Sequence, residues 1–65
     1  MGVKVVAYDI EGGEGRENLG IYESVQMTGR QLRDTEGNII LWWFGNGWVS
    51  MKSGKSWYDW TVEGV

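Results

Sequence analysis

Five indole side chains are the groups of this chain best suited to binding a ligand. The 65 residues contain tryptophan at Trp42, Trp43, Trp48, Trp57 and Trp60. An indole combines a large apolar surface with one N–H donor, so it can fill a core or stack against a ligand. Because so short a chain has one small core, we expect some of these rings to be internal and the others to form an exposed aromatic surface.

Carboxylates are the second kind of group that could do chemistry here. The polar segment 11–18, which should be a long loop, contains Glu11, Glu14 and Glu17. An acidic loop of this kind attracts cationic groups of a partner. Asp9 and Glu11 are spaced to share one face of a strand, where a carboxylate pair could in principle hydrolyse a glycoside. Exposed carboxylates on a sheet explain the spacing more simply, so we predict that the protein is not an enzyme.

The chain contains no histidine and no cysteine, which limits its chemistry further. His-assisted nucleophilic catalysis and metal–thiolate sites both need these side chains. The glycine-rich segment 12–15 lacks the Gly-Lys-Ser/Thr ending of a phosphate-binding loop. We therefore expect neither a bound metal nor a cofactor.

The charge balance argues against two classes of partner. Nine acidic and six basic residues give a net charge of −3, whereas binding to nucleic acid or to an anionic membrane relies on Lys and Arg. No apolar run approaches the ~20 residues of a membrane span, and the first residues lack the plan of a secretory signal. We expect a cytoplasmic protein with one domain over residues 1–65.

Short β-branched and aromatic runs between glycine clusters must position the tryptophans and carboxylates. No segment has a helical period, so the pattern predicts an all-β fold. The main expected strands are 3–10, 21–27, a short segment at Leu32, 39–44 and 56–63. The expected turns are 34–38, 45–47 and 53–55. We expect a small five-stranded antiparallel barrel, because closing the sheet removes apolar edges that would be unsafe to expose.

Alternation divides the first two expected strands into faces. In 3–10, one face carries Val3, Val5 and Ala7, and the other carries Val6, Tyr8 and Ile10. In 21–27, the predicted inner face carries Ile21, Val25 and Met27, with Glu23 as an exception.

The last hairpin sorts three of the five tryptophans. A two-residue loop at 54–55 would pair Met51 with Tyr58 and Val49 with Trp60. This face is apolar, and we assign it to the core as Val49, Met51, Tyr58, Trp60 and Val62. The opposite face is mixed, and we predict that it points outward with Trp48, Trp57, Ser50, Lys52 and Asp59.

The hairpin at 45–47 allows two registers. A two-residue loop at Asn46-Gly47 places Trp42 and Phe44 in the core and Trp43 outside. A three-residue loop, 45–47, exchanges the two faces, because a shift of one residue turns every side chain over. The predicted exposed patch is therefore Trp48, Trp57 and either Trp42 or Trp43. Alternatively, the loop 11–18 covers this face and makes it a second small core.

Several short motifs resemble those of SH3 domains, and they occur in the same order. Val6-Ala7-Tyr8-Asp9-Ile10 resembles the Ala-Leu-Tyr-Asp-Tyr strand of that family, and the acidic segment 11–18 follows it where the family has its acidic loop. Glu17-Asn18-Leu19-Gly20-Ile21 is similar to the segment that closes that loop. The pair Trp42-Trp43 resembles the paired tryptophans of the family.

Two further motifs lie nearer the end of the chain. Gly47-Trp48-Val49-Ser50 resembles the family's Gly-Trp-Val-Pro stretch, with Ser50 where proline is expected. The segment 48–57 is also similar to the ending of bacterial SH3-type domains. The resemblance implies that Tyr8 and Trp42 line grooves for a proline-rich peptide, while Glu14 and Glu17 attract a basic ligand residue.

We interpret the chain as a non-catalytic module that binds a protein or peptide partner, which we expect to be basic or proline-rich. A small inhibitor of a larger protein would act in this way. The expected ligand-binding residues are Trp48, Trp57, Trp42, Trp43, Tyr8, Glu14, Glu17 and Asp59. Two alternatives stay open. In the first, exposed indoles stack on sugar rings while Asp59 and Ser50 bind hydroxyls. In the second, the protein is a structural or engineered barrel that forms a homo-oligomer through its aromatic face.

Overall fold

The computed structural model of the protein describes residues 1–10 and 13–65. Its secondary structure consists of eight strands and no helix within these residues. The strands are β1 (Val3–Tyr8), β2 (Arg16–Tyr22), β3 (Val25–Thr28), β4 (Gln31–Asp34), β5 (Ile39–Trp43), β6 (Trp48–Ser50), β7 (Ser56–Trp57) and β8 (Asp59–Gly64).

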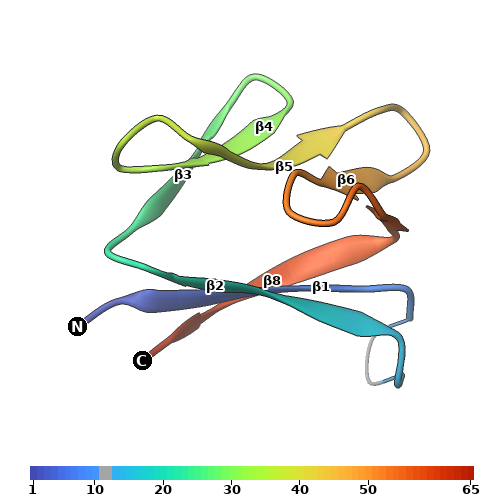
Figure 1. The fold of residues 1–65 in the computed structure, drawn as a ribbon, viewed down its shortest axis with the longest axis horizontal. Helices are drawn as coiled ribbons and strands as arrows, with labels where there is room; N and C mark the ends of the chain where they lie inside the picture. The colour runs from blue at the N-terminus through green and yellow to red at the C-terminus, as the bar shows by residue number, and fades with distance from the viewer. Residues whose placement is uncertain (11–12) are drawn as a thin grey trace.

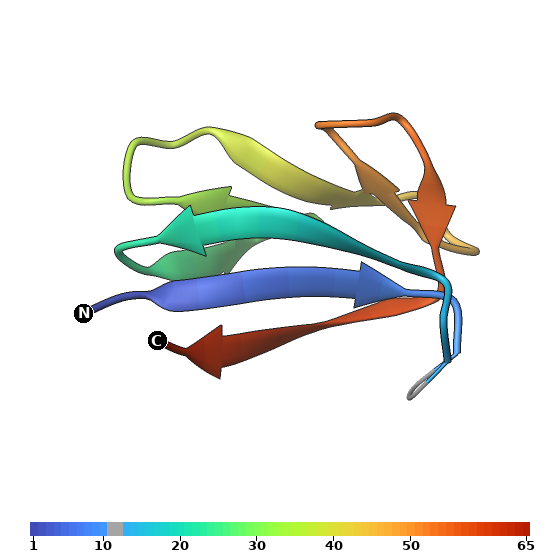
Figure 2. The ribbon, with the colours of Figure 1, turned by 60° about the horizontal axis from the view of Figure 1, so that its bottom comes forward.

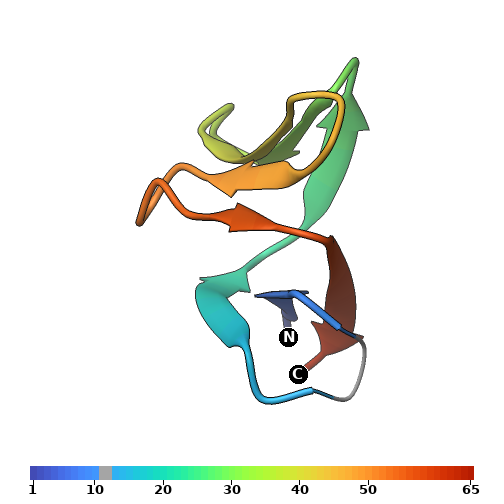
Figure 3. The ribbon, with the colours of Figure 1, turned by 90° about the vertical axis from the view of Figure 1, so that its right-hand side faces the viewer.

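The strands form two antiparallel sheets that lie in two layers (Figure 1). The smaller sheet has the order β2-β1-β8, and the larger one has the order β3-β4-β5-β6-β7. In the smaller sheet, β1 and β8 run side by side in opposite directions, and the two chain ends lie near each other (Figure 2). The chain passes between the layers twice, from β2 to β3 and from β7 to β8 (Figure 3).

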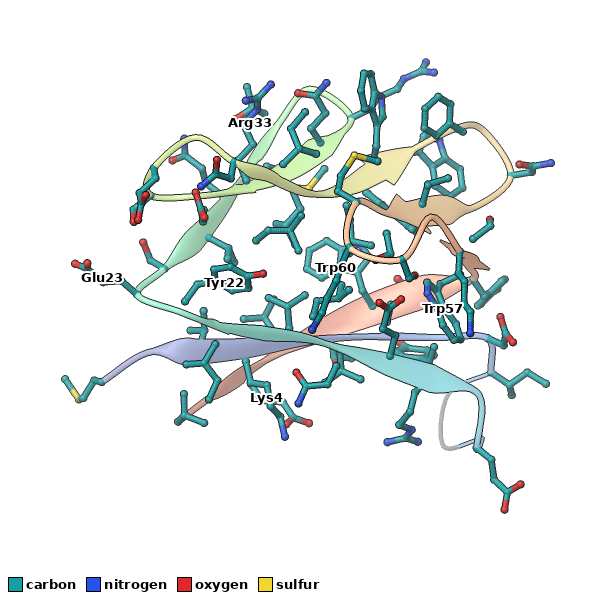
Figure 4. All side chains as sticks on the ribbon, viewed as in Figure 1. Lys4, Tyr22, Glu23, Arg33, Trp57 and Trp60 are labelled. Carbon is teal, nitrogen blue, oxygen red and sulfur yellow. The ribbon has the colours of Figure 1, made fainter. Side chains whose placement is uncertain are left out.

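The core lies between the two sheets and takes residues from both. Its buried members are Val5, Ala7, Leu19, Leu32, Ile40, Leu41 and Trp57, with Tyr22, Val25, Trp48 and Trp60 packed against them. In β1, Val5 and Ala7 are both fully buried, so the face that carries them is the inner face of this strand. Side chains of Tyr22, Trp57 and Trp60 lie between the layers, whereas Lys4 and Arg33 project from the outer surfaces (Figure 4).

The all-β class is confirmed, but the five-stranded barrel is not. The eight described strands form two separate sheets and no closed barrel. Three expected boundaries were wrong, and two of them were wrong because the chain changes sheets. The expected strand 21–27 is divided between β2 and β3, the expected strand 56–63 is divided between β7 and β8, and β2 already begins at Arg16 within the expected loop 11–18.

The change of sheet between β2 and β3 also reverses the predicted direction of one side chain. Ile21 points outward and is 64% exposed, whereas Met27 lies on the inner face as predicted, opposite Leu32, and is 46% exposed at the margin of that face. Val25, the third residue of that expected inner face, does pack against the core. Side-chain alternation holds only while a strand stays in one sheet, so a pattern read across the break at 23–24 could not be correct throughout.

The turn between β4 and β5 is confirmed, and the side chain of Asp34 organises it. The Asp34 carboxylate accepts hydrogen bonds from the backbone N–H groups of Glu36 and Asn38, each at 2.9 Å. Gly37 adopts a positive φ of 87°, which glycine tolerates without strain. Burial alone would raise the pKa of Asp34, but these backbone hydrogen bonds outweigh it and lower the pKa.

The hairpin between β5 and β6 has a third register that differs from both expected ones. Trp43 pairs with Trp48, and the Phe44 N–H donates to the Gly47 carbonyl at 3.0 Å, so the two-residue loop is Gly45-Asn46. Gly45 has a φ of 84°, whereas no non-glycine residue among those described has a positive φ. This pattern fits a type II′ turn, which needs glycine at its first central position.

We expect Gly45→Ala to destabilise the protein by about 1–2 kcal/mol, because a Cβ at this positive φ approaches the following carbonyl. Gly64→Ala is the matched control, since Gly64 has no positive φ and an added Cβ meets no atom within 4 Å. Urea denaturation measures both variants. Equal stability of the two would show that this turn does not depend on glycine.

Candidate functional site

The inner face of the larger sheet carries three of the five tryptophans. Trp43 pairs with Trp48, and Trp48 pairs with Trp57, so the three indoles lie on one face of β5, β6 and β7. The same face carries Leu41 and Ser50, which are both fully buried, so it points toward the smaller sheet. The sequence therefore grouped Trp48 and Trp57 correctly on one face but assigned that face to the wrong side.

A row of aromatic contacts runs from this face into the core. The ring centroids of Trp43 and Trp48 are 5.2 Å apart. Trp60, from the smaller sheet, makes an edge-to-face contact with Trp48 at 5.5 Å. Edge-to-face and tilted aromatic pairs are favourable beyond the area that they bury. Trp48 is therefore half-buried between two other indoles rather than exposed.

Trp57 is the clearest correction among the predicted site residues, since it is only 8% exposed. Several residues assigned to the core are instead exposed, namely Met51, Tyr58 and Val62, while Val49 lies half-buried on the outer face. Tyr58 is 72% exposed because the chain leaves the larger sheet at this residue, where its N–H donates to the Tyr8 carbonyl at 3.0 Å. The alternation therefore restarts in β8.

Glu17, in β2, connects the two sheets through its side chain. Its Oε1 accepts hydrogen bonds from Trp57 Nε1 at 2.9 Å and from Ser53 Oγ at 2.7 Å. Its Oε2 accepts a longer one from Ser50 Oγ at 3.3 Å. Ser50 Oγ in turn accepts from the backbone N–H groups of Lys52 and Ser53. Glu17 is therefore engaged within the protein, and its expected role as an attractor of a basic ligand has no support from these contacts.

The electrostatics of Glu17 follow from this arrangement. Partial burial alone would raise its pKa. The hydrogen bonds from Ser53, Trp57 and Ser50 outweigh this effect, together with the positive charge of Lys52, and hold the pKa of Glu17 below its ordinary value of 4.5. The carboxylate is thus stabilised in its charged form, as a structural acceptor should be.

A shallow hollow of about 240 Å³ lies where the inner face extends beyond the core. Its lining consists of Met27, Gly29, Arg30, Trp43 and Trp48. Met27 is 46% exposed, and both indoles are half-buried, so apolar surface is open to solvent here. We call this site the Trp43–Trp48 hollow. It brings together two of the predicted site residues.

The remaining predicted site residues lie elsewhere. Trp42 occupies the outer face of the larger sheet and stacks on Phe44 at a centroid distance of 5.2 Å. Tyr8 is buried on the outer face of the smaller sheet, beside a polar groove of about 490 Å³ that Lys4 and Arg16 also line. Because Tyr8 and Trp42 lie on outer faces of different sheets, the structure does not join them into one groove.

The two predicted acidic site residues outside β2 are exposed. Glu14 lies in the connection between β1 and β2, and Asp59 begins β8, where its Oδ1 accepts a hydrogen bond from the Trp60 N–H at 2.8 Å. Of the carboxylate pair considered for hydrolysis, Asp9 is exposed and Glu11 lies outside the described residues. The sugar-stacking arrangement loses two of its members, since Trp57 and Ser50 are buried.

Sequence reasoning did not identify Met27 and Arg30 as site residues. A β-hairpin joins β3 to β4, with Thr28 paired to Gln31, and brings both residues to the hollow. Gly29 between two polar, alternating segments is a turn signal that could have indicated this hairpin. Its consequence for Met27 depends on which sheet the hairpin joins, and the local pattern does not contain that information.

Within residues 1–10 and 13–65, no cluster of acidic side chains is arranged to hold a metal ion. In the same residues, no helix is long and apolar enough to span a membrane. No protein-family model matches the chain, and neither a curated protein nor a solved structure gives a significant match. The candidate site therefore stands on its geometry alone.

Proposed function

We propose that this protein is a non-catalytic binding module that takes an apolar side chain of a protein or peptide partner into the Trp43–Trp48 hollow. The observation that carries the proposal is the composition of this site. Two half-buried indoles, an exposed methionine and an arginine surround one concave apolar surface. Trp and Arg are enriched among the residues that dominate the binding energy of protein interfaces, and Met is enriched in interfaces relative to the rest of the surface.

The size of the hollow favours a macromolecular partner over a free small molecule. Pockets that enclose drug-sized ligands have volumes of about 300–1,000 Å³, whereas this hollow has about 240 Å³. It suits one protruding side chain that a larger partner holds in place. Arg30, at the rim, can pair with a carboxylate of the partner beside that side chain.

The proposal narrows the function expected from the sequence. The expected partner is still a protein or peptide, and Trp43 and Trp48 are still ligand-binding residues. The proposal removes Trp57 and Glu17, because their polar groups bind each other. The negative net charge can still favour a basic partner at long range, but the proposal does not use an acidic loop or a proline-rich groove.

Peptides selected from a random display library on the wild-type protein provide the test. We expect them to share an apolar anchor residue and to lose at least about tenfold in affinity for Trp43→Ala, as a residue near a hot spot does. Isothermal titration calorimetry measures the affinities. Trp42→Ala is the matched control, because Trp42 is a half-buried indole in the same strand on the opposite face.

Two results would argue against the proposal. One is a set of peptides that binds Trp43→Ala as tightly as the wild type. The other is a set whose affinity falls with Trp42→Ala and not with Trp43→Ala, which would move the site to the outer face of the larger sheet.

A further inference from the structure

The edge strand β3 lacks the protection that the other edges of the two sheets have. Edge strands are normally kept from pairing with other chains by charges, bulges or short length. Edge strand β2 contains Arg16, Glu17 and a bulge in its pairing with β1, β8 contains Asp59 and Glu63, and β7 has only two residues. By contrast, β3 reads Val-Gln-Met-Thr, without charge, proline or glycine, and pairs regularly with β4.

Opposite charges stand at the two ends of this strand. Glu23 precedes the first residue of β3 by two positions, and Arg30 follows its last residue by two positions. Both side chains are exposed, and Glu23 projects into solvent where the chain passes between the layers (Figure 4). The ion pair found among the described residues joins Lys4 to Glu63 and involves neither of them.

The charges that flank β3 make this edge complementary to the same edge of a second copy. When two copies of β3 pair in antiparallel orientation, the beginning of each strand lies beside the end of the other. Glu23 of each copy then lies within about one residue of Arg30 of the second copy, so opposite charges attract at both ends of the pair. The symmetric register that places Met27 of the two copies opposite each other also brings these two apolar side chains together, since opposed residues share a face.

We propose that β3 is a homodimerisation edge, where it pairs antiparallel with β3 of a second copy and joins the two five-stranded sheets. The contact is isologous, so it closes with two copies and does not propagate. Four residues on each side form a small interface, below the ~1,200 Å² of stable complexes, so the dimer should be weak and concentration-dependent. The proposal uses the main chain of β3 and its flanking charges. It shares Arg30 with the function proposed for the Trp43–Trp48 hollow, but it does not require a ligand in that hollow.

Charge reversal provides the experiment. Sedimentation equilibrium of the wild-type protein is expected to show a monomer–dimer equilibrium between about 10 μM and 1 mM. Glu23→Arg and Arg30→Glu each replace both attractions by repulsions, so we expect each variant alone to dimerise at least about tenfold more weakly. An equimolar mixture of the two variants restores both attractions, and so does the double variant. Both should dimerise as the wild type does.

Matched controls separate pairing from net charge and folding. Glu14→Arg and Lys55→Glu make the same changes of charge at exposed positions away from β3, and we expect both to keep the wild-type equilibrium. Far-UV circular dichroism checks that each variant is folded. A protein that stays monomeric up to about 1 mM would overturn the proposal, and so would a dimer that the reversals leave unchanged. Loss of the dimer in Trp43→Ala, without sensitivity to the reversals, would place the contact on the aromatic surface instead.

Discussion

Replacing Trp57 by alanine is expected to destabilise the protein by about 3–5 kcal/mol, the range found when a large aromatic residue is removed from a core. Trp57 is 8% exposed and belongs to the core cluster. Its loss also removes the Nε1–H donor of the Glu17 carboxylate. Because small domains are stable by only about 5 kcal/mol or little more, we expect a large unfolded population in Trp57→Ala at room temperature.

Two further variants divide this effect into packing and hydrogen bonding. Trp57→Phe keeps an aromatic ring but removes the indole N–H, so it should cost less than Trp57→Ala. Trp42→Ala removes the same side chain from the outer face, where it stacks only partly buried on Phe44, and should also cost less. Urea denaturation followed by circular dichroism measures all three. If Trp42→Ala lost as much stability as Trp57→Ala, our assignment of the inner face would be wrong.

Acid is expected to weaken the protein through Glu17. Its pKa is lowered in the folded state, so the carboxylate contributes stability that is fully present above its ordinary pKa of 4.5. This contribution is lost as the pH falls through the lower, folded-state pKa, where the proton displaces the accepted hydrogen bonds. Glu17→Gln removes the charge at every pH, so its stability should fall less steeply below about pH 4.5 than that of the wild type.

At neutral pH, Glu17→Ala should cost about 1.5–3 kcal/mol, as expected for hydrogen bonds to a charged group. Ser50 is fully buried, and Trp57 is nearly so, so each would lose an acceptor where water has little access. Glu14→Ala is the control, since Glu14 is exposed in the connection between β1 and β2. The comparison is made from urea midpoints between pH 2.5 and 7. Parallel pH profiles of the wild type and Glu17→Gln would contradict the structural role that we assign to Glu17.

The sequence predicted local features well where one strand or one turn contains all the information. Alternation in β1 placed Val5 and Ala7 on the same face, and both are fully buried. The turn around Asp34 was recognised from its polar residues and glycine, because these side chains satisfy the backbone of their own segment. The grouping of Trp48 with Trp57 on one face was also correct, although the register of this hairpin was wrong: Val49 pairs with Ser56 and not with Trp60. The difference is four residues, and an even shift leaves each side chain on the same face as before.

The hairpin at Gly45-Asn46 shows how a local signal can be recognised and still be read in the wrong register. Its glycines indicated a turn, but three placements of the loop were compatible with the amino-acid sequence. The placement found keeps Leu41 opposite Ser50, two residues that are both fully buried between the sheets. The register is chosen by what the whole strand buries, and a turn of four residues does not contain that preference.

The candidate site, too, could be predicted from the sequence only in part. The residue types of the Trp43–Trp48 hollow are visible in the chain, yet Met27 and Arg30 join it only through the hairpin that places β3 at the edge of the larger sheet. The predicted outward direction of Trp57 failed for a related reason. The polar residues on the same face predicted that Trp57 is exposed to solvent. Instead, Glu17, 40 residues earlier in the chain, accepts a hydrogen bond from the indole N–H, so Trp57 can be buried.

The amino-acid sequence therefore determined the all-β class, the positions of most turns and the pairing of indoles on common faces, because these depend on neighbouring residues and on strand periodicity. The tertiary structure decided which face of the larger sheet is internal, where the chain changes sheets and which side chains surround the hollow. These features depend on contacts between residues far apart in the chain, such as Glu17 with Trp57 and Trp48 with Trp60. The free energy of burying a polar or aromatic group is set by such distant partners, and no local pattern specifies them.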